Sequence, residues 1–293
     1  MYTIKEAALR TELSIPVLRA WQRRYEIVSP QRTAARYRLY SDEDIARLRA
    51  MRRLVVDGWS PSAAAKAVKS APAERAPGVT QALPADSAVV VDRFISAAAA
   101  MDSAGLESTL DEMWSAGSFE EVAERHVLPA LVALGEAWAR GEVDVAAEHA
   151  ASHAVLRRLA AAFEAAGAAV SNARPVLVGL PSAARHELGA LAFAVTLRRS
   201  GVPVTYLGAD LPPADWLEAV RHTNARAAVI AVPTESDREA AANVAEALRA
   251  TAPELVVATG GRGADRSSDA GILVLPDELR AAARELRLEM GER

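Results

Sequence analysis

The C-terminal part of the chain, residues 174–293, alternates short apolar runs with stretches of helical periodicity. This alternation predicts a doubly wound α/β domain of the flavodoxin-like, Rossmann-like kind, with a five-stranded parallel sheet and helices on both faces. A ligand is expected at the carboxyl ends of the strands. The runs are Pro175–Leu180, Val202–Leu207, Ala227–Val232, Leu255–Thr259 and Ile272–Leu275, and the helical stretches are Glu187–Arg199, Ala214–His222, Arg238–Ala250 and one from Asp277.

The loop after the first predicted strand, Pro181 to Gly189, places His186 at the mouth of the sheet. A loop can present an imidazole nitrogen to a metal or a cofactor, which makes His186 a ligand candidate, although a structural histidine is the alternative. After the fourth strand, Gly260 and Gly261 leave room for a bulky, flat group to approach the backbone. A dinucleotide site is not expected, because no GxGxxG motif follows the first strand.

Residues 89–169 predict a four-helix bundle, with helices over Val89–Met101, Leu106–Trp114, Phe119–Arg140 and Val143–Ala169. Trp138, near the end of the third helix, and Glu148 with His149, in the fourth, could line one cavity with an indole wall and two hydrogen-bonding groups. For Trp138 alone, a place in the core is the simpler interpretation. His149 and His153 have the spacing of a metal pair but lack an evident third ligand.

Residues 1–69 are basic in a chain that is acidic overall. They carry 14 Lys and Arg against 7 Asp and Glu, a net charge of +7, so the remainder of a chain whose total is −4 carries −11. Because neutralisation of phosphates dominates affinity for nucleic acids, the basic part and the acidic part are expected to meet different partners. A solvated arginine-rich face is the alternative.

The same basic part has the pattern of a helix-turn-helix. Thr3 and Glu6 have the spacing of a capping box, and Ser14 and Pro16 can start a second helix. On that helix, Arg19, Arg23 and Arg24 lie with Trp21 and Tyr25, a face that could enter a major groove. A turn and an alternating segment follow and predict a wing, and Ser41 to Asp44 open another helix.

Composition limits the remaining choices. The chain has 293 residues and no cysteine, which excludes disulfides and thiolate metal sites and agrees with a reducing cytoplasm. It shows neither a signal-peptide pattern nor an apolar stretch long enough for a membrane, so we expect a cytoplasmic protein without membrane contact. Residues 70–88 have the composition of a linker between the basic part and the bundle.

In this order, the segments LRAWQRRYEIVSP and RYRLYSDEDIARL resemble the winged helix-turn-helix of MerR-type transcription regulators. The resemblance covers about residues 1–69. It implies that the second helix reads bases of a double-stranded operator while Arg36, Tyr37 and Arg38 of the wing hold the flanking backbone.

The C-terminal part resembles the cobalamin-binding fold of methionine synthase and the corrinoid mutases, through His186-x-x-Gly189 and the Gly260-Gly261 pair. With Trp138-x9-Glu148-His149 upstream, the whole chain resembles the light-responsive adenosylcobalamin regulators of the CarH/LitR type. This implies a homo-oligomeric repressor, a dimer or a tetramer, that binds DNA in the dark and dissociates when light breaks the cobalt–carbon bond. His186 is then the lower axial ligand of cobalt, and Trp138, Glu148 and His149 surround the adenosyl side.

Three positions depart from this pattern. Ala184 stands where an acid normally orients the axial imidazole, and Ala139 stands where some relatives have a histidine. Ala231 replaces a hydroxyl residue near the nucleotide tail, for which Thr234 and Ser236 are the substitutes. A MerR-type regulator whose pocket is degenerate or holds another tetrapyrrole is therefore the alternative, and a corrinoid-dependent enzyme subunit fits less well because of the DNA-binding part.

Overall fold

The computed structural model describes residues 2–11, 13, 15–25, 27–28, 30–32, 38–56, 65, 68, 85–167, 174–265 and 271–291. Contacts divide the chain into two compact units, one of residues 1–82 with 136–142, and one of residues 83–135 with 143–293. The predicted bundle and the predicted α/β part therefore share the second unit, apart from the last turns of one bundle helix.

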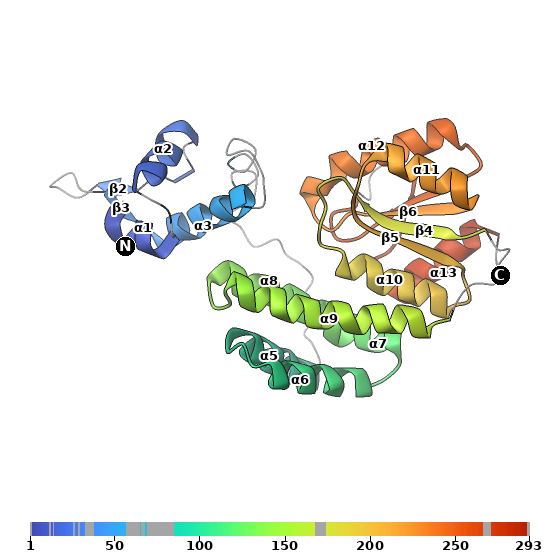
Figure 1. The fold of residues 1–293 in the computed structure, drawn as a ribbon, viewed down its shortest axis with the longest axis horizontal. Helices are drawn as coiled ribbons and strands as arrows, with labels where there is room; N and C mark the ends of the chain where they lie inside the picture. Colours follow the sequence, from blue (N-terminus) through green and yellow to red (C-terminus); the bar gives the residue numbers. More distant parts are fainter. Residues whose placement is uncertain are drawn as a thin grey trace. The chain divides into compact units, whose positions relative to one another are not determined.

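The first unit contains a helix-turn-helix and a small antiparallel sheet. Its helices are α1 (Ile4–Thr11), α2 (Ile15–Tyr25) and α3 (Asp42–Val56), and its strands β1 (Tyr2–Thr3), β2 (Gln31–Arg32) and β3 (Arg38–Tyr40) pair in the order β1-β3-β2 (Figure 1). The antiparallel pairing of β2 with β3 confirms the predicted wing. Strand β1 was not expected, because two residues are too few to show a strand period.

Local sequence signals fix where two of these helices begin. The Thr3 hydroxyl accepts a hydrogen bond from the Glu6 amide at 3.4 Å, and the Glu6 carboxylate accepts one from the Thr3 amide at 2.7 Å. The predicted capping box is thus confirmed. Ser41 and Asp44 form the same reciprocal pair ahead of α3, at 3.0 and 2.9 Å.

The second unit begins with a four-helix bundle, as predicted. Its helices are α5 (Ala85–Ala99), α6 (Ser103–Ser115), a continuous run from Phe119 to Arg140, and α9 (Val145–Ala165). The run consists of α7 (Phe119–Val122), the π-helical turn η1 (Ala123–Val127) and α8 (Leu128–Arg140). Since α5 starts at Ala85, the predicted linker is four residues too long at its end, and the rest of residues 70–88 lies outside the described residues.

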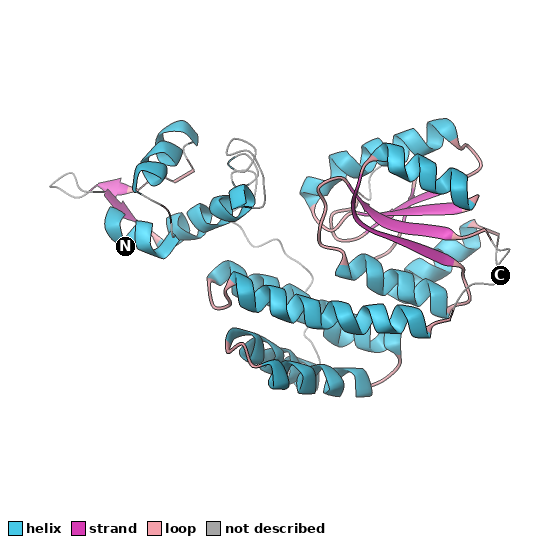
Figure 2. Ribbon diagram, viewed as in Figure 1, coloured by secondary structure: helices cyan, strands magenta, loops and turns pink. Residues whose placement is uncertain are grey.

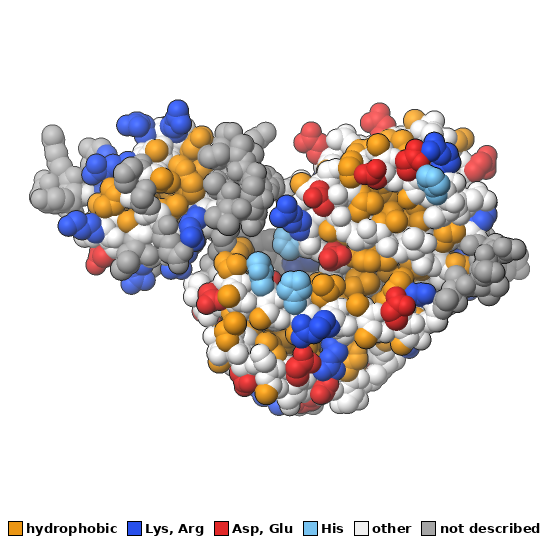
Figure 3. Space-filling view, viewed as in Figure 1, with side chains coloured by type: hydrophobic (Ala, Val, Ile, Leu, Met, Phe, Trp, Pro, Cys, Tyr) orange, Lys and Arg blue, Asp and Glu red, His pale blue; other side chains and the backbone are white. Residues whose placement is uncertain are grey.

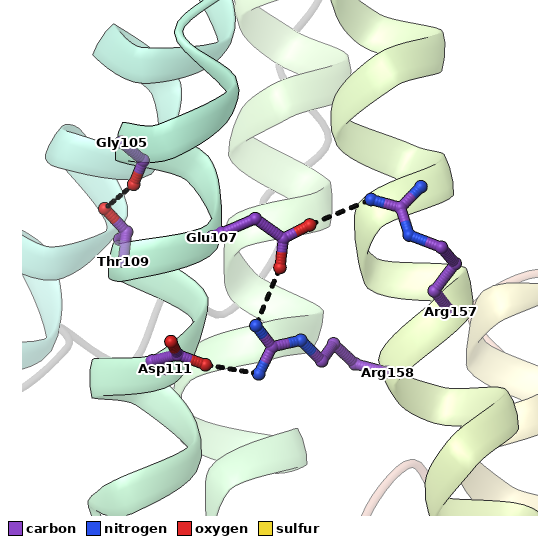
Figure 4. A network of polar contacts seen from close by, with 6 residues as sticks. All are labelled: Gly105, Glu107, Thr109, Asp111, Arg157 and Arg158. Atoms are coloured by element: carbon purple, nitrogen blue, oxygen red, sulfur yellow. Dashed lines mark hydrogen bonds and ion pairs between the residues drawn. The ribbon is translucent and has the colours of Figure 1, made fainter.

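Charged side chains connect α6 with α9 on the surface of the bundle. Arg158 donates to Glu107 at 2.7 Å and to Asp111 at 2.5 Å, while Arg157 donates to the other oxygen of Glu107 at 2.9 Å (Figure 4). The two arginines lower the pKa of Glu107 through these hydrogen bonds. The network joins two helices that are about fifty residues apart in the sequence and so fixes their register.

The α/β part has five parallel strands in the order β5-β4-β6-β7-β8, as predicted. Helices α10 and α13 cover one face and α11 and α12 the other (Figure 2). Helix α9 of the bundle packs against α10. The strands are β4 (Val176–Pro181), β5 (Val204–Leu211), β6 (Ala227–Ala231), β7 (Val256–Gly260) and β8 (Leu273–Val274), and the helices are α10 (Leu188–Arg199), α11 (Pro213–Thr223), η2 (Glu235–Asp237), α12 (Arg238–Thr251) and α13 (Leu279–Glu289).

Strand β4 occupies the centre of the sheet, and its six residues are all buried. It lies between β5 and β6, the two strands that follow it in the sequence. The connection from β4 to β5 therefore runs in one direction along the sheet, and the connection from β5 to β6 returns past β4 in the other direction. This change of direction is the point at which doubly wound sheets bind ligands, at the carboxyl ends of the strands.

Candidate functional site

The loop that carries His186 leaves the carboxyl end of β4 and leads into α10, as predicted. Its backbone is held by the end of the neighbouring strand β5. The Asp210 carboxylate accepts a hydrogen bond from the Ala183 amide at 2.6 Å, and the Asp210 amide donates to the Ala184 carbonyl at 3.1 Å. Asp210 has a φ of 59° and Ala183 a φ of 66°, both in the left-handed region. These two non-glycine residues in a costly conformation indicate a loop whose shape is fixed by its surroundings.

A second contact from β5 fixes the residue next to His186. The Tyr206 hydroxyl lies 2.8 Å from Oε2 of Glu187 and 3.3 Å from the carbonyl oxygen of the same residue. Burial, followed by the hydrogen bond to Glu187 and its negative charge, raises the pKa of Tyr206 well above its usual range. The phenol is therefore protonated near neutral pH and donates to Glu187.

The imidazole of His186 itself is exposed, and in the described part of the chain it has no hydrogen-bond partner. Ala184, two residues before His186, is 2% exposed, and its methyl side chain offers the imidazole no hydrogen-bond acceptor. Gly189, in the first turn of α10, has open space where a side chain would begin. A free imidazole beside an open glycine fits the approach of a broad ligand to this edge of the sheet.

The glycines that follow β7 have a role in packing two loops together. At Gly261, with a φ of 110°, a Cβ would lie 2.7 Å from the Val232 carbonyl oxygen, and at Gly263 it would lie 2.1 Å from the Thr234 carbonyl oxygen. The missing side chains thus allow the loop after β7 to pack on the loop after β6. At Gly261 the space that a side chain would take is filled by the protein's own backbone, and the approach of a ligand to Gly261 stays a prediction. At Gly260 an added Cβ would lie 3.3 Å from Cβ of Leu275.

Thr234 and Ser236 lie at the carboxyl end of β6, but their hydroxyls are already paired. The Thr234 hydroxyl lies 2.6 Å from the Asp237 carboxylate and 2.7 Å from the Ser236 hydroxyl. The Asp237 carboxylate also accepts from the Thr234 amide at 3.0 Å, which completes a capping box ahead of η2. A ligand group that needs the Thr234 hydroxyl has to compete with Asp237 for it.

Glu148 ends the first turn of α9 and His149 follows it; Asp144 caps this helix through the Ala147 amide at 2.8 Å. Glu148 accepts a hydrogen bond from Ser152 at 2.6 Å, and its other oxygen lies 3.7 Å from Nε2 of His149. The His149 side chain is 67% exposed, so it is available to a ligand. Trp138 lies in the last turn of α8 and is half-buried.

Histidine side chains gather near the middle of the face shown in Figure 3. Within the described ranges, no group of three or more His, Asp or Glu side chains is arranged to hold a metal ion. The His149–His153 spacing thus gains no third ligand there. A metal that arrives inside a cofactor needs only one protein ligand, which His186 can supply.

In the first unit, α2 presents the side chains of Arg19, Arg23 and Arg24 to solvent. Trp21 is only 7% exposed and packs in the core with Leu18, so the expectation that its ring reaches DNA is wrong. The position of Trp21 on an amphipathic helix could not by itself distinguish a base contact from a core contact. The predicted wing residues Arg36 and Tyr37 lie outside the described residues, and Arg38 is half-buried on β3.

Two family models match the chain. One, the MerR HTH family regulatory protein, covers residues 2–71, and the other, the B12 binding domain, covers residues 90–162. The HTH-type transcriptional repressor CarH of Myxococcus xanthus is 35% identical over 228 residues, which are 75% of this chain and 74% of that protein. The repressor CarA of the same organism is 33% identical over 266 residues, 89% of this chain and 86% of that protein.

The chain belongs to the family of CarH and CarA. It is a DNA-binding transcription regulator of the MerR type with a cobalamin-binding domain, and its relatives are repressors rather than enzymes. The monomethylamine corrinoid protein of Methanosarcina barkeri has the same fold over 68% of this chain and 97% of its own, with a TM-score of 0.56 and 14% identity. In the part of the chain that the structure describes, no helix is both long and apolar enough to cross a membrane.

Proposed function

We propose that this protein is a light-sensitive repressor that binds adenosylcobalamin at the carboxyl edge of the sheet, with His186 as the lower axial ligand of cobalt. The observation that carries this proposal is the free imidazole of His186 on a loop fixed by β5, beside the open position at Gly189. The bound cofactor supplies a light-sensitive cobalt–carbon bond. The protein's own residues supply the axial nitrogen, the walls of the site and the connection to assembly.

Residues of the bundle are proposed to enclose the adenosyl side. Glu148 and His149 offer a carboxylate and an imidazole near the start of α9, and Ser152 holds one oxygen of Glu148 in place. Trp138 supplies an apolar wall. Near the sheet, Thr234 and Gly260 are the proposed neighbours of the cofactor, and the hydroxyl of Thr234 is the group that must leave Asp237 to bind it.

DNA binding is assigned to the first unit. Arg19, Arg23 and Arg24 are proposed to reach the major groove from α2, while Arg36, Tyr37 and Arg38 of the wing contact the backbone. A single winged domain makes few contacts, and joining two or four copies through the acidic part raises affinity for an operator without any new base contact. The ligand controls binding if it favours one assembly state over another.

The test is the visible spectrum of the full chain, purified in the dark with adenosylcobalamin. We expect a red or orange protein whose spectrum changes on illumination. His186→Ala should remove the spectral contribution of an axial imidazole, whereas His222→Ala, which changes another exposed histidine on α11, should leave it unchanged. An unaltered spectrum in the His186 variant contradicts the assignment of His186 to cobalt.

The alternative is a regulator of the same family with a degenerate or repurposed pocket. It is favoured by Ala184 and Ala231 and by the pairing of Thr234 with Asp237, which remove or occupy the polar groups expected for the cofactor. Under this alternative the protein stays colourless after incubation with adenosylcobalamin in the dark, yet still binds its operator. The same preparation therefore distinguishes the two proposals.

A further inference from the structure

A basic pocket lies where the bundle meets the helices on one face of the sheet, away from the loop of His186. It has a volume of about 250 Å³, slightly less than the roughly 300–1,000 Å³ of pockets that hold drug-sized ligands. Its walls come from α7, the C-terminal half of α10, and α13 (Figure 1). We call it the arginine pocket, lined by Glu120, Thr196, Arg199, Ser200, Arg280, Ala283, Arg284 and Arg287.

Four arginines and one carboxylate line this pocket, so its charge is strongly positive in a part of the chain that is acidic overall. The single carboxylate is already used, because Nε of Arg199 lies 2.7 Å from Glu120, whose side chain is only 15% exposed. Burial is the largest single effect and raises the pKa of Glu120, but the hydrogen bond from Arg199, a backbone hydrogen bond and the charges of Arg199 and Arg280 together lower the pKa below its usual value. Glu120 is thus ionised and neutralises one arginine.

Two of the other guanidinium groups, those of Arg280 and Arg284, have no carboxylate partner among the described residues. The guanidinium of Arg280 donates to the neutral hydroxyl of Ser118 at 2.6 Å. Arg284 is exposed, and among the described residues it has no hydrogen-bond or ion-pair partner. Clustered arginines repel one another, and this cost is offset when an anion binds between them.

The chemistry of such an anion follows from these donors. Arginine forks match the oxygens of phosphate, to which they donate two parallel hydrogen bonds, and several forks around a small cavity suit a group with more than one negative charge. The hydroxyls of Thr196 and Ser200 donate to carbonyls of α10, so the donors to a bound anion are the guanidinium groups and not these hydroxyls. The volume accepts a phosphate or a diphosphate group.

We propose that the arginine pocket binds a phosphate or diphosphate group and thereby joins α10 and α13 to α7. The occupant is either the free inorganic anion or the phosphate end of a larger metabolite whose remainder lies in solvent. A ligand that bridges the two faces of this junction stabilises the packing of the bundle on the α/β part. This inference does not depend on the cobalamin site, since α10 carries the pocket at its end and the loop of His186 precedes its start.

The experiment measures binding of inorganic pyrophosphate to the full-length protein by calorimetry, with thermal unfolding as a second readout. We expect saturable binding and a midpoint of unfolding that rises with pyrophosphate at constant ionic strength. Arg284→Ala removes a guanidinium that supports no other contact, and it should weaken binding by about tenfold or more. Arg221→Ala, which removes an exposed arginine of α11, is the matched control and should bind as the wild type does.

A second titration with adenosine diphosphate separates the two sources of the group. Binding of both ligands, each weakened by Arg284→Ala, identifies a site that takes a diphosphate with a larger group attached. Binding of pyrophosphate alone identifies a site for the free anion. The proposal is overturned if neither ligand binds saturably, or if Arg284→Ala and Arg221→Ala change the affinity equally.

Discussion

Tyr206→Phe tests whether β5 fixes the loop of His186. The substitution removes the hydroxyl that donates to Glu187 at 2.8 Å and keeps the ring, which lies 6.3 Å from the ring of Phe163. A hydrogen bond to a charged acceptor contributes about 1.5–3 kcal/mol. Because Glu187 is half-buried and water can replace part of the contact, we expect a loss near the lower limit, about 1.5 kcal/mol.

For a unit of this size, such a loss lowers the midpoint of thermal unfolding by roughly 3–6 °C. The assay is unfolding of the cofactor-free protein, followed by circular dichroism, together with titration of both forms with adenosylcobalamin in the dark. Weaker binding in the variant is expected, because a looser loop pays an ordering cost on binding. Glu187→Gln keeps an acceptor for the phenol and is the control that should lose less stability.

The raised pKa of Tyr206 gives the same prediction a pH dependence. The unfolded chain releases this proton near pH 10, whereas the folded protein retains it to higher pH. The stability that Tyr206 contributes is therefore complete below pH 10 and is lost as the pH rises further. Tyr206→Phe should remove that part of the alkaline destabilisation. Equal midpoints for the wild type and the variant at neutral pH, together with equal alkaline slopes, refute the reasoning.

Four further predictions concern other parts of the molecule. Arg23→Ala should weaken operator binding in gel-shift titrations and reduce its salt dependence by about one ion. Trp21→Ala should instead destabilise the first unit by about 3–5 kcal/mol, because the side chain is buried, and the circular dichroism spectrum of this variant should show a loss of helical signal. Gly261→Ala should lower the unfolding midpoint, because its φ of 110° and the Val232 carbonyl 2.7 Å away leave no place for a methyl group; an unchanged midpoint contradicts the packing of the two loops. Burial and the charge of Arg125 lower the pKa of His126 below 6.5, and they outweigh the opposite effect of the Glu121 charge. The contribution of His126 to stability should therefore fall as the pH drops below 6.5, and His126→Gln should lessen the loss of stability at acidic pH.

Helix and strand positions could be predicted from the sequence because they follow from local periods and caps. All five strands of the α/β part and the four bundle helices lie where the apolar pattern placed them, with ends shifted by a few residues. The capping box at Thr3 and Glu6 was readable in the same way, since it depends on residues three apart. Strand β1 escaped prediction because it exists only by pairing with β3, far along the chain.

The roles of individual side chains were less accessible. Trp21 has the spacing of both a groove contact and a core contact, and only its packing around Leu18 decides between them. Gly261 has no side chain to keep other groups away, and the carbonyl of Val232 lies in the space that a side chain would take. Tyr206 and Asp210 carry no motif, and a polar residue near the end of a predicted strand was the sole available signal for either.

The sequence alone determined the order of the elements, the division into a basic and an acidic part, and the residue types at the mouth of the sheet. Periodicity, charge and spacing are properties of the chain. Which groups remain free to act was decided by the tertiary structure. His186 has an open imidazole, whereas the hydroxyl of Thr234 is taken by Asp237, and the arginine pocket assembles from three helices separated in the chain. Hydrogen bonds and burial depend on distances in space, and those distances exist only once the chain has folded.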